Sequence, residues 1–258
     1  MAAAPTASSP RSWARTYVPP QHGVWAMLVV PFVLGTAASS AGWWTLPLLV
    51  VWVDAYLVSY YALLGLKARR LARYRAPLRL YTVVLVVVSL PLVAMRPWLV
   101  AAAVAFVPLV LLNAWFAYRR DDRNWLNGVV SVTQACLIVF VAYGLGEGVV
   151  TAADLSSVEW SAAVQLFVAA WLYFTGTVLF VKTMIREAGE SSYYRASVAY
   201  HLVACLLAAL VDPWLALPFG LYLVRAVALP RHRLRPAQVG VVEVVDSVLL
   251  VVVALLTT

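Results

Sequence analysis

The chain is a succession of long apolar runs, and this pattern limits the folds open to it more than any other feature. A helix needs roughly 20 apolar residues to cross a bilayer, or fewer where neighbouring helices shield it. Backbone polar groups inside a bilayer must be satisfied within the protein, so such runs predict helices. The expected spans are residues 22–39, 43–66, 78–95, 98–117, 125–145, 158–181, 196–211, 214–229 and 238–257. We therefore expect an all-α, polytopic membrane helical bundle of about nine transmembrane helices.

The composition supports this class of protein. Of the 258 residues, 64% are hydrophobic and 12% are charged, whereas a soluble domain is nearer half apolar and a quarter charged. The net charge of +8 falls in short loops between the runs, which argues against nucleic acid as a partner and leaves the lipid bilayer. Cys136 and Cys205 both lie within apolar runs, so we expect two unpaired thiols and no disulfide framework.

The first residues differ in composition from the rest. Residues 1–20 are rich in Ala, Pro and Ser, and they lack the apolar core and the cleavage site of a signal peptide. We expect a short disordered cytoplasmic tail there. A single transmembrane helical domain is then expected over residues 21–258.

The positions of Lys and Arg predict the orientation of the bundle. Threading the nine spans from a cytoplasmic N-terminus places 18 of the 19 Lys and Arg residues on the inner side and leaves Arg96 outside. Positively charged loops favour the cytoplasmic side of a membrane. The acidic residues assigned to the outer side are Glu147, Asp154, Glu159 and Asp212. An odd number of spans then places the C-terminus outside.

Basic side chains end three of the spans on the expected inner side and are the first candidates for a ligand site. Lys182 and Arg186 are four residues apart and would share one helix face. If the three helix ends converge, they form an anion site able to grip phosphate; if they are scattered, they only set the topology. The candidate ligand-binding residues are Gln21, Lys67, Arg70, Tyr118, Arg119, Arg120, Lys182, Arg186, Tyr194 and Arg195.

Three further residues near that side are candidates for orienting a ligand or moving protons, namely His22, Glu187 and His201. Helix capping or contact with lipid head groups is the alternative role for the two histidines. Two histidines without a Cys, Asp or Glu at ligand spacing make a poor metal site. We therefore predict neither a metal nor a cofactor from these residues.

Three acidic residues lie inside predicted spans. Asp54 is near the middle of the second span, and Glu243 and Asp246 are three residues apart in the last one. A carboxylate at the bilayer centre costs about 2.5–3.5 kcal/mol on insertion scales, so these side chains should face the bundle interior. They could be structural hydrogen-bond acceptors or the coupling carboxylates of a transporter. No P-loop is present, which argues against a nucleotide-driven pump.

Two motifs carry a resemblance to a known family. The first reads Pro-Gln-His-Gly-Val-Trp-Ala-Met-Leu over residues 20–28, and the second reads Phe-Val-Lys-Thr-Met-Ile-Arg-Glu over residues 180–187 and continues to Ser197 and His201. Together they resemble the YwiC-like family of bacterial integral membrane proteins, and the resemblance covers nearly the whole chain after residue 17. It implies a multi-pass protein of the bacterial plasma membrane and does not imply an activity.

The number of spans and the places of the polar motifs also resemble, more distantly, the UbiA superfamily of membrane prenyltransferases. Residues 118–120, followed by 127–128, are similar to a basic element of those enzymes. They hold a prenyl diphosphate through Mg²⁺ bound to two aspartate-rich motifs. Here the corresponding segments, 60–67 and 180–187, contain Glu187 as their one carboxylate. Mg²⁺ prefers several oxygen ligands, so the resemblance implies a UbiA-like fold without the usual metal site.

The residues and the resemblance together favour a bundle that binds an isoprenoid diphosphate or an anionic lipid in a basic cavity facing the cytoplasm. If the protein is an enzyme, the resemblance implies prenyl transfer to a quinone- or haem-like acceptor. A secondary transporter for a small anion and a non-catalytic membrane scaffold are the alternatives. The first function needs a tapered apolar cavity with cations at its inner mouth. The transporter needs a polar site at mid-membrane that contains Asp54.

Overall fold

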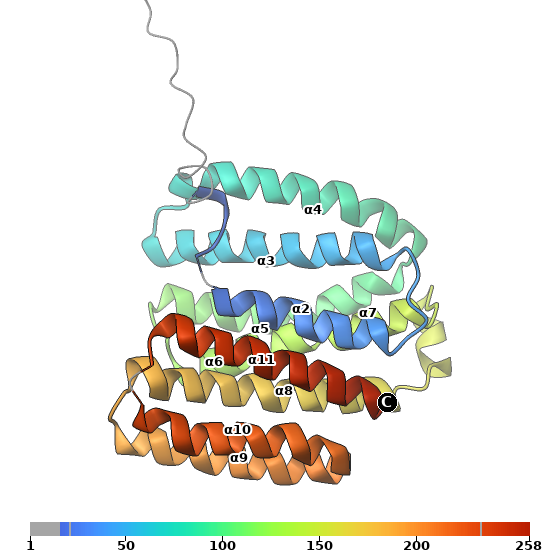
Figure 1. The fold of residues 1–258 in the computed structure, drawn as a ribbon. Coiled ribbons are helices and arrows are strands. Elements are labelled where there is room, and N and C mark those ends of the chain that lie inside the picture. Colours follow the sequence, from blue (N-terminus) through green and yellow to red (C-terminus); the bar gives the residue numbers. More distant parts are fainter. Residues whose placement is uncertain (1–15, 21, 233) are drawn as a thin grey trace, which may run out of the picture.

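The computed structural model describes residues 16–20, 22–232 and 234–258, and within these ranges the chain forms helices and no strand (Figure 1). The side chain of His22 is not described, and Gln21 and residues 1–15 lie outside the described residues. The long helices are α2 (His22–Ala37), α3 (Thr45–Ala68), α4 (Arg75–Met95), α5 (Trp98–Tyr118), α6 (Trp125–Cys136), α7 (Ile138–Gly146), α8 (Ser161–Val181), α9 (Ser191–Val211), α10 (Ala216–Ala228) and α11 (Pro236–Leu256). Short helical turns connect them: η1 (Leu71–Tyr74), η2 (Ala152–Ser157), η3 (Lys182–Arg186), η4 (Pro213–Leu215) and η5 (Leu229–Arg231).

Eight helical segments of the described chain are long and apolar enough to cross a membrane. They correspond to eight of the nine expected spans, and α6 and α7 together make one of them, Trp125–Gly146. The first expected span is the shorter helix α2, whose 16 residues extend about 24 Å at 1.5 Å per residue. The expected all-α, polytopic membrane bundle is therefore confirmed. The chain is a multi-pass membrane protein.

The short helix α2 lies in the middle of the bundle (Figure 1). It packs against α7, α11, α8 and α6, so neighbouring helices shield it as its length requires. The pair α3 and α4 lies at one edge of the bundle, and the pair α9 and α10 lies at the other. The fold is thus two outer helix pairs on either side of a layer centred on α2 and α8.

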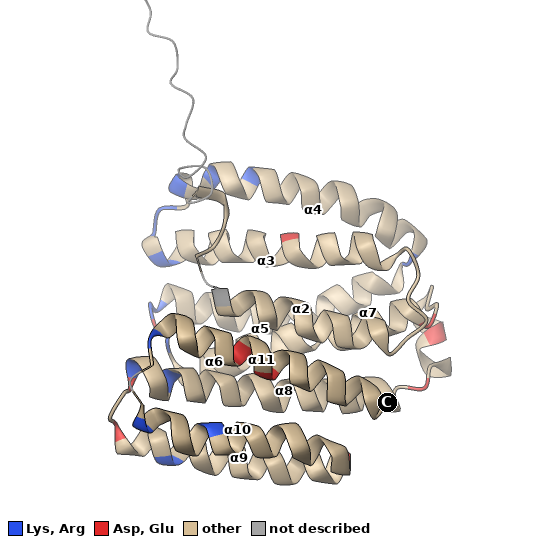
Figure 2. Cartoon of the chain, in the orientation of Figure 1, with Lys and Arg blue, Asp and Glu red and all other residues tan. Residues whose placement is uncertain are grey.

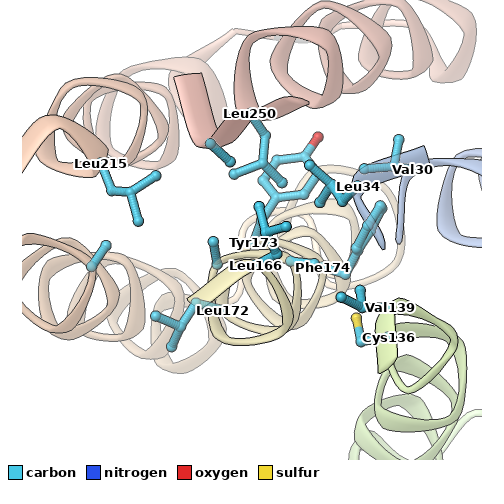
Figure 3. Packing of buried hydrophobic residues seen from close by; sticks show 14 of the residues in the cluster. Val30, Leu34, Cys136, Val139, Leu166, Leu172, Tyr173, Phe174, Leu215 and Leu250 are labelled. Atoms are coloured by element: carbon cyan, nitrogen blue, oxygen red, sulfur yellow. The ribbon is translucent and has the colours of Figure 1, made fainter. Parts of the chain in front are cut away.

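The largest apolar cluster joins the central layer to the α9–α10 pair (Figure 3). Leu34 of α2, Phe174 of α8 and Leu250 of α11 are all at most 2% exposed and pack together there. Cys136 is buried in the same cluster, and Cys205 is half-buried. Both thiols are unpaired, as expected.

One glycine permits an unusually close approach of α2 and α7. A Cβ atom added to Gly35 would overlap the backbone carbonyl oxygen of Val139. The obstacle is backbone rather than the end of a flexible side chain, so it cannot move aside without shifting a helix. Gly23, on the same helix, has no atom within 4 Å of such a Cβ. The α2–α7 contact therefore depends on Gly35.

Charged side chains separate between the two ends of the bundle (Figure 2). Lys and Arg gather where α3, α5 and α8 end and where α4, α6 and α9 begin, and acidic residues mark the loops at the opposite end. The positive-inside rule assigns the basic end to the cytoplasm, and we call it the inner end. Arg96 lies at the outer end, where its guanidinium is 5.4 Å from the Trp44 ring centroid. One basic residue departs from the expected pattern, because Arg225 is 6% exposed and sits within the bundle.

The last residues of the expected tail are attached to the bundle. The hydroxyl of Tyr61 on α3 donates a hydrogen bond to the backbone oxygen of Thr16 at 3.0 Å, and that of Tyr81 on α4 donates to the backbone oxygen of Tyr17 at 2.6 Å. Thr16 and Tyr17 are therefore bonded to α3 and α4, and the disordered tail expected over residues 1–20 stays a prediction.

In the loop between α7 and α8, one carboxylate organises the chain at the outer end. The carboxylate of Asp154 accepts hydrogen bonds from the backbone N–H groups of Val150 and Thr151 at 3.0 and 2.8 Å. These bonds favour the charged form and hold the pKa of Asp154 below its ordinary value.

The loop should consequently loosen in acid. A group whose pKa is lowered by folding stabilises the folded form above its unfolded pKa, and this contribution disappears as the pH falls through its folded pKa. Titrating the amide NMR signals of Val150 and Thr151 should give a common midpoint below that of an unstructured aspartate. Asp154→Asn should abolish the transition. A midpoint at or above the ordinary value would contradict this assignment.

Candidate functional site

A long cavity of about 880 Å³ lies among α2, α3, α4, α5, α6 and α7. Along α3 its wall extends from Leu48 to Lys67, a separation of 19 residues or about 28 Å along a helix. The cavity therefore runs nearly the full length of the bundle, from the outer end to the inner end. Its volume falls within the range of protein pockets that bury small-molecule ligands.

Most of the cavity wall is apolar. Leu48 and Trp52 of α3, Leu92 of α4, Phe106 of α5 and Ile138 of α7 line its outer half. These positions come from separate helices whose apolar faces meet across the cavity and do not fill it. Such a wall suits an extended hydrocarbon chain.

Within the part of the chain that the structure describes, charged residues line the cavity only at its inner end. There the Nζ atom of Lys67 lies 2.6 Å from a carboxylate oxygen of Asp122, which belongs to the loop between α5 and α6. The two side chains are 38% and 37% exposed, so water reaches the pair and its net contribution to stability is small. The side-chain amide of Asn127 donates to the backbone oxygen of Asp122 at 2.9 Å and positions that loop.

Three uncharged polar side chains line the cavity one to two helical turns deeper. The amide nitrogen of Asn113 on α5 donates to the side-chain oxygen of Gln134 on α6 at 2.8 Å. The hydroxyl of Ser131 on α6 lies 3.0 Å from the side-chain oxygen of Asn113. Polar groups are costly inside a bilayer unless they find partners, and here they satisfy one another in part across the α5–α6 contact.

Lys182, at the end of α8, also contacts the α5–α6 loop at the inner end. The Nζ atom of Lys182 donates a hydrogen bond to the backbone oxygen of Arg123 at 2.9 Å. Lys182 begins η3, a π-helical turn that ends α8, and such turns frequently occur at functional positions. The ends of α3 and α8 thus both contact the α5–α6 loop, one through Asp122 and the other through Arg123.

Comparisons with known proteins place the chain in a family. The model of the YwiC-like protein family matches residues 18–143. The uncharacterized protein YwiC of Bacillus subtilis is 30% identical over 237 residues, which cover 90% of this chain and 94% of the relative. The chain belongs to the YwiC-like family. An uncharacterized protein of Haemophilus influenzae is 29% identical over 240 residues, or 92% of this chain and 97% of that protein. No solved structure matches the chain, and the likeness to the UbiA superfamily stays a prediction.

In this YwiC-like protein, the expected basic side chains divide into two groups. Lys67 lines the cavity, and Lys182 contacts the loop beside it. The others at the inner end do not line the cavity and are exposed: Arg70, Arg119, Arg120, Arg186 and Arg195. The three helix ends therefore converge, but the structure does not bring their cations into one ring.

The two expected tyrosines and Glu187 lie away from the cavity wall. Tyr118 is exposed, and its ring centroid is 5.7 Å from the guanidinium of Arg69. The hydroxyl of Tyr194 donates to the backbone oxygen of Val227 at 3.2 Å and ties α9 to α10. Glu187 is half-buried and follows η3, where its backbone N–H bonds the carbonyl of Lys182 at 2.8 Å.

His201 lies inside the bundle on the far side of α8 from the cavity. It is 3% exposed, and its Nδ1 atom is 2.7 Å from the backbone oxygen of Ser197. Its Nε2 atom faces Gly176 of α8 and has no hydrogen-bond partner among the described residues. His22 opens α2, and its side chain, like Gln21, is not described.

Glu243 and Asp246 form a buried ion cluster with Arg225. The Nη1 atom of Arg225 donates to a carboxylate oxygen of Glu243 at 2.7 Å and to one of Asp246 at 2.5 Å. Thr177 and Tyr173 of α8 donate to the other oxygen of Glu243 at 2.7 and 3.2 Å. The guanidinium also lies 4.2 Å from the Phe180 ring centroid. We call the residues Arg225, Glu243 and Asp246 the ion cluster.

Asp54 belongs neither to the ion cluster nor to the cavity wall. It is 6% exposed on α3, and the cavity is lined instead by its neighbours Ala55 and Tyr56. The ion cluster joins α10 and α11, away from the α3–α4 pair. The three carboxylates that were grouped in the transporter hypothesis are therefore in two separate places. Among the described residues, no group of three or more His, Cys, Asp or Glu residues could hold a metal.

Proposed function

We propose that this YwiC-like protein binds a long-chain amphipathic molecule of the isoprenoid or lipid type. The single observation that supports the proposal is the cavity itself, which follows α3 from Leu48 to Lys67, is mostly apolar, and has the charged groups of its described wall at the inner end. A hydrocarbon chain bound in the cavity is transferred from water or from the bilayer into contact with an apolar wall. Its polar head meets the side chains at the inner end.

The proposal also assigns a location and an orientation. The named relatives are bacterial proteins, and the helices are apolar enough to span a membrane. We place the protein in the bacterial plasma membrane with its inner end in the cytoplasm. The exposed arginines of that end, among them Arg119 and Arg186, then face anionic lipid head groups at the membrane surface.

Filling the cavity should displace the ligand. Ala55 lines the cavity on α3, and phenylalanine at this position would occupy the space of several carbons of the chain. Native mass spectrometry of the full-length protein extracted from membranes should show a bound long-chain lipid, and Ala55→Phe should reduce its occupancy about tenfold or more.

The matched control is Val50→Phe on the same helix, because Val50 is 41% exposed and does not line the cavity. That variant should retain the lipid. The proposal fails if no lipid is bound to the unmodified protein, or if both variants retain the lipid equally.

A further inference from the structure

The polar side chains along the cavity wall also indicate which kind of lipid head group fits the cavity. This inference rests on the proposed lipid binding. Among the described residues, the charged groups of the wall are Lys67 and Asp122, one of each sign, and they are paired at 2.6 Å. The inner end of the wall is therefore neutral in sum. This differs from the basic cavity expected from the sequence.

A phosphate or diphosphate group would find too few cations in this wall. Anionic groups removed from water need several charge-assisted hydrogen bonds, best supplied by arginine, and none of the arginines that the structure describes lines the cavity. Lys182 is engaged by the carbonyl of Arg123, and Arg119 lies over the ring of Trp115 at 5.4 Å. An anion beside Lys67 would in addition meet the carboxylate of Asp122.

Uncharged donors and acceptors, by contrast, are plentiful. Asn113, Ser131 and Gln134 form a connected set on one side of the cavity. This set is incompletely satisfied. The single hydroxyl proton of Ser131 is shared between two acceptors, the side chain of Asn113 and the backbone oxygen of Asn127, so one acceptor is left open.

Two further lining residues carry polar atoms that lack partners among the described residues. These are the hydroxyl of Tyr56 on α3 and the side-chain oxygen of Asn127 on α6. A buried polar group without a partner destabilises the protein. Groups of this kind along a ligand-sized cavity are ready to bind carbonyl and hydroxyl oxygens of a ligand.

We infer that the cavity selects a long-chain lipid whose head group is uncharged and bears carbonyl or hydroxyl oxygens, the chemistry of a polyprenol or a long-chain quinone. The chain lies against α3, α5 and α7, and the oxygens bond to the amide and hydroxyl side chains of α5 and α6. Asp122 acts in specificity, because its carboxylate disfavours anionic heads of the same chain length.

The test compares two probes that share one prenyl chain. Binding of geranylgeraniol and of geranylgeranyl diphosphate to the purified full-length protein is measured by native mass spectrometry in the same detergent. We expect the alcohol to bind about tenfold more tightly than the diphosphate. The combined variant Asn113→Leu and Gln134→Leu should lose about tenfold in affinity for the alcohol, the effect of one or two lost hydrogen bonds.

Asp122→Asn provides a second variant at a half-exposed position. It removes the one carboxylate from the cavity wall and should increase the affinity for the diphosphate about tenfold, with little change for the alcohol. Tighter binding of the diphosphate by the unmodified protein would overturn the inference and leave the proposed lipid binding intact. Binding of neither probe would count against the proposed lipid binding itself.

Discussion

Arg225→Met is expected to destabilise the protein strongly, because Arg225 lies within the bundle. The side chain of Arg225 is 5% exposed, and its Nη1 atom bonds both carboxylates of the ion cluster. Removing the cation leaves the carboxylates of Glu243 and Asp246 buried near each other without a counter-charge. Breaking a buried pair by removing one member costs about 3–5 kcal/mol in soluble proteins. Fluorescence-detected size-exclusion chromatography after heating should therefore show a much lower melting temperature, or no folded protein.

A control variant and a rescue variant distinguish destabilisation by unpaired buried carboxylates from the effect of losing any one positive charge. Arg231→Met, at an exposed position just beyond α10, should leave the melting temperature unchanged. Combining Arg225→Met with Glu243→Gln and Asp246→Asn removes all charge from the cluster and should recover most of the folded protein. If the triple variant is as unstable as Arg225→Met alone, unpaired charge is not the cause.

Gly35→Ala is expected to have the second-largest effect. The added Cβ would overlap the backbone oxygen of Val139, so α2 and α7 must move apart and the central packing is disturbed. Overpacking of this kind costs about 1–3 kcal/mol. The same heating assay should show a lower melting temperature for Gly35→Ala in detergent.

Gly23→Ala is the matched control, since it makes the same change on the same helix in open space. Alanine is favoured over glycine in a helix by about 1 kcal/mol, so this control should be as stable as the unmodified protein or slightly more so. Equal stability of both variants would show that the α2–α7 contact can open without cost.

The helices could be predicted from the sequence because a long apolar run is a local property. Runs such as 43–66 and 98–117 coincide within a few residues with α3 and α5. The basic inner end follows from the same reasoning, because Lys and Arg at the ends of these runs determine orientation. Each of these conclusions depends on neighbouring residues in the chain and on nothing that lies across the bundle.

The cavity wall could not be predicted in this way. Asn113, Ser131 and Gln134 are uncharged polar residues within largely apolar runs, and whether they face lipid, protein or a cavity depends on how α5 and α6 are rotated against each other. Their presence inside two consecutive spans was nevertheless a usable signal, because polar side chains within a bilayer are expensive and avoid lipid. The charged residues at the helix ends are the stronger signal in the sequence, and they do not indicate these three positions.

The buried position of Arg225 could not be predicted from the sequence for a different reason. It lies three residues before the end of α10, and a rule that counts charges near span ends assigns such a residue to the inner loop. The apolar residues 226–229 that follow it were a sign that the helix continues. The partners of Arg225 come from α11, at Glu243 and Asp246, and only the packing of α10 on α11 reveals them.

Helix α8 acts as a partition between the two polar regions of the molecule. Thr177 bonds Glu243 of the ion cluster on one side, and the next residue, Val178, forms part of the cavity wall on the other. The two side chains are fixed to one rigid helical turn, so α8 cannot rotate to widen the cavity at Val178 without drawing Thr177 away from Glu243. A rotation of α8 that changed the cavity wall at Val178 would therefore also change the hydrogen bond between Thr177 and Glu243.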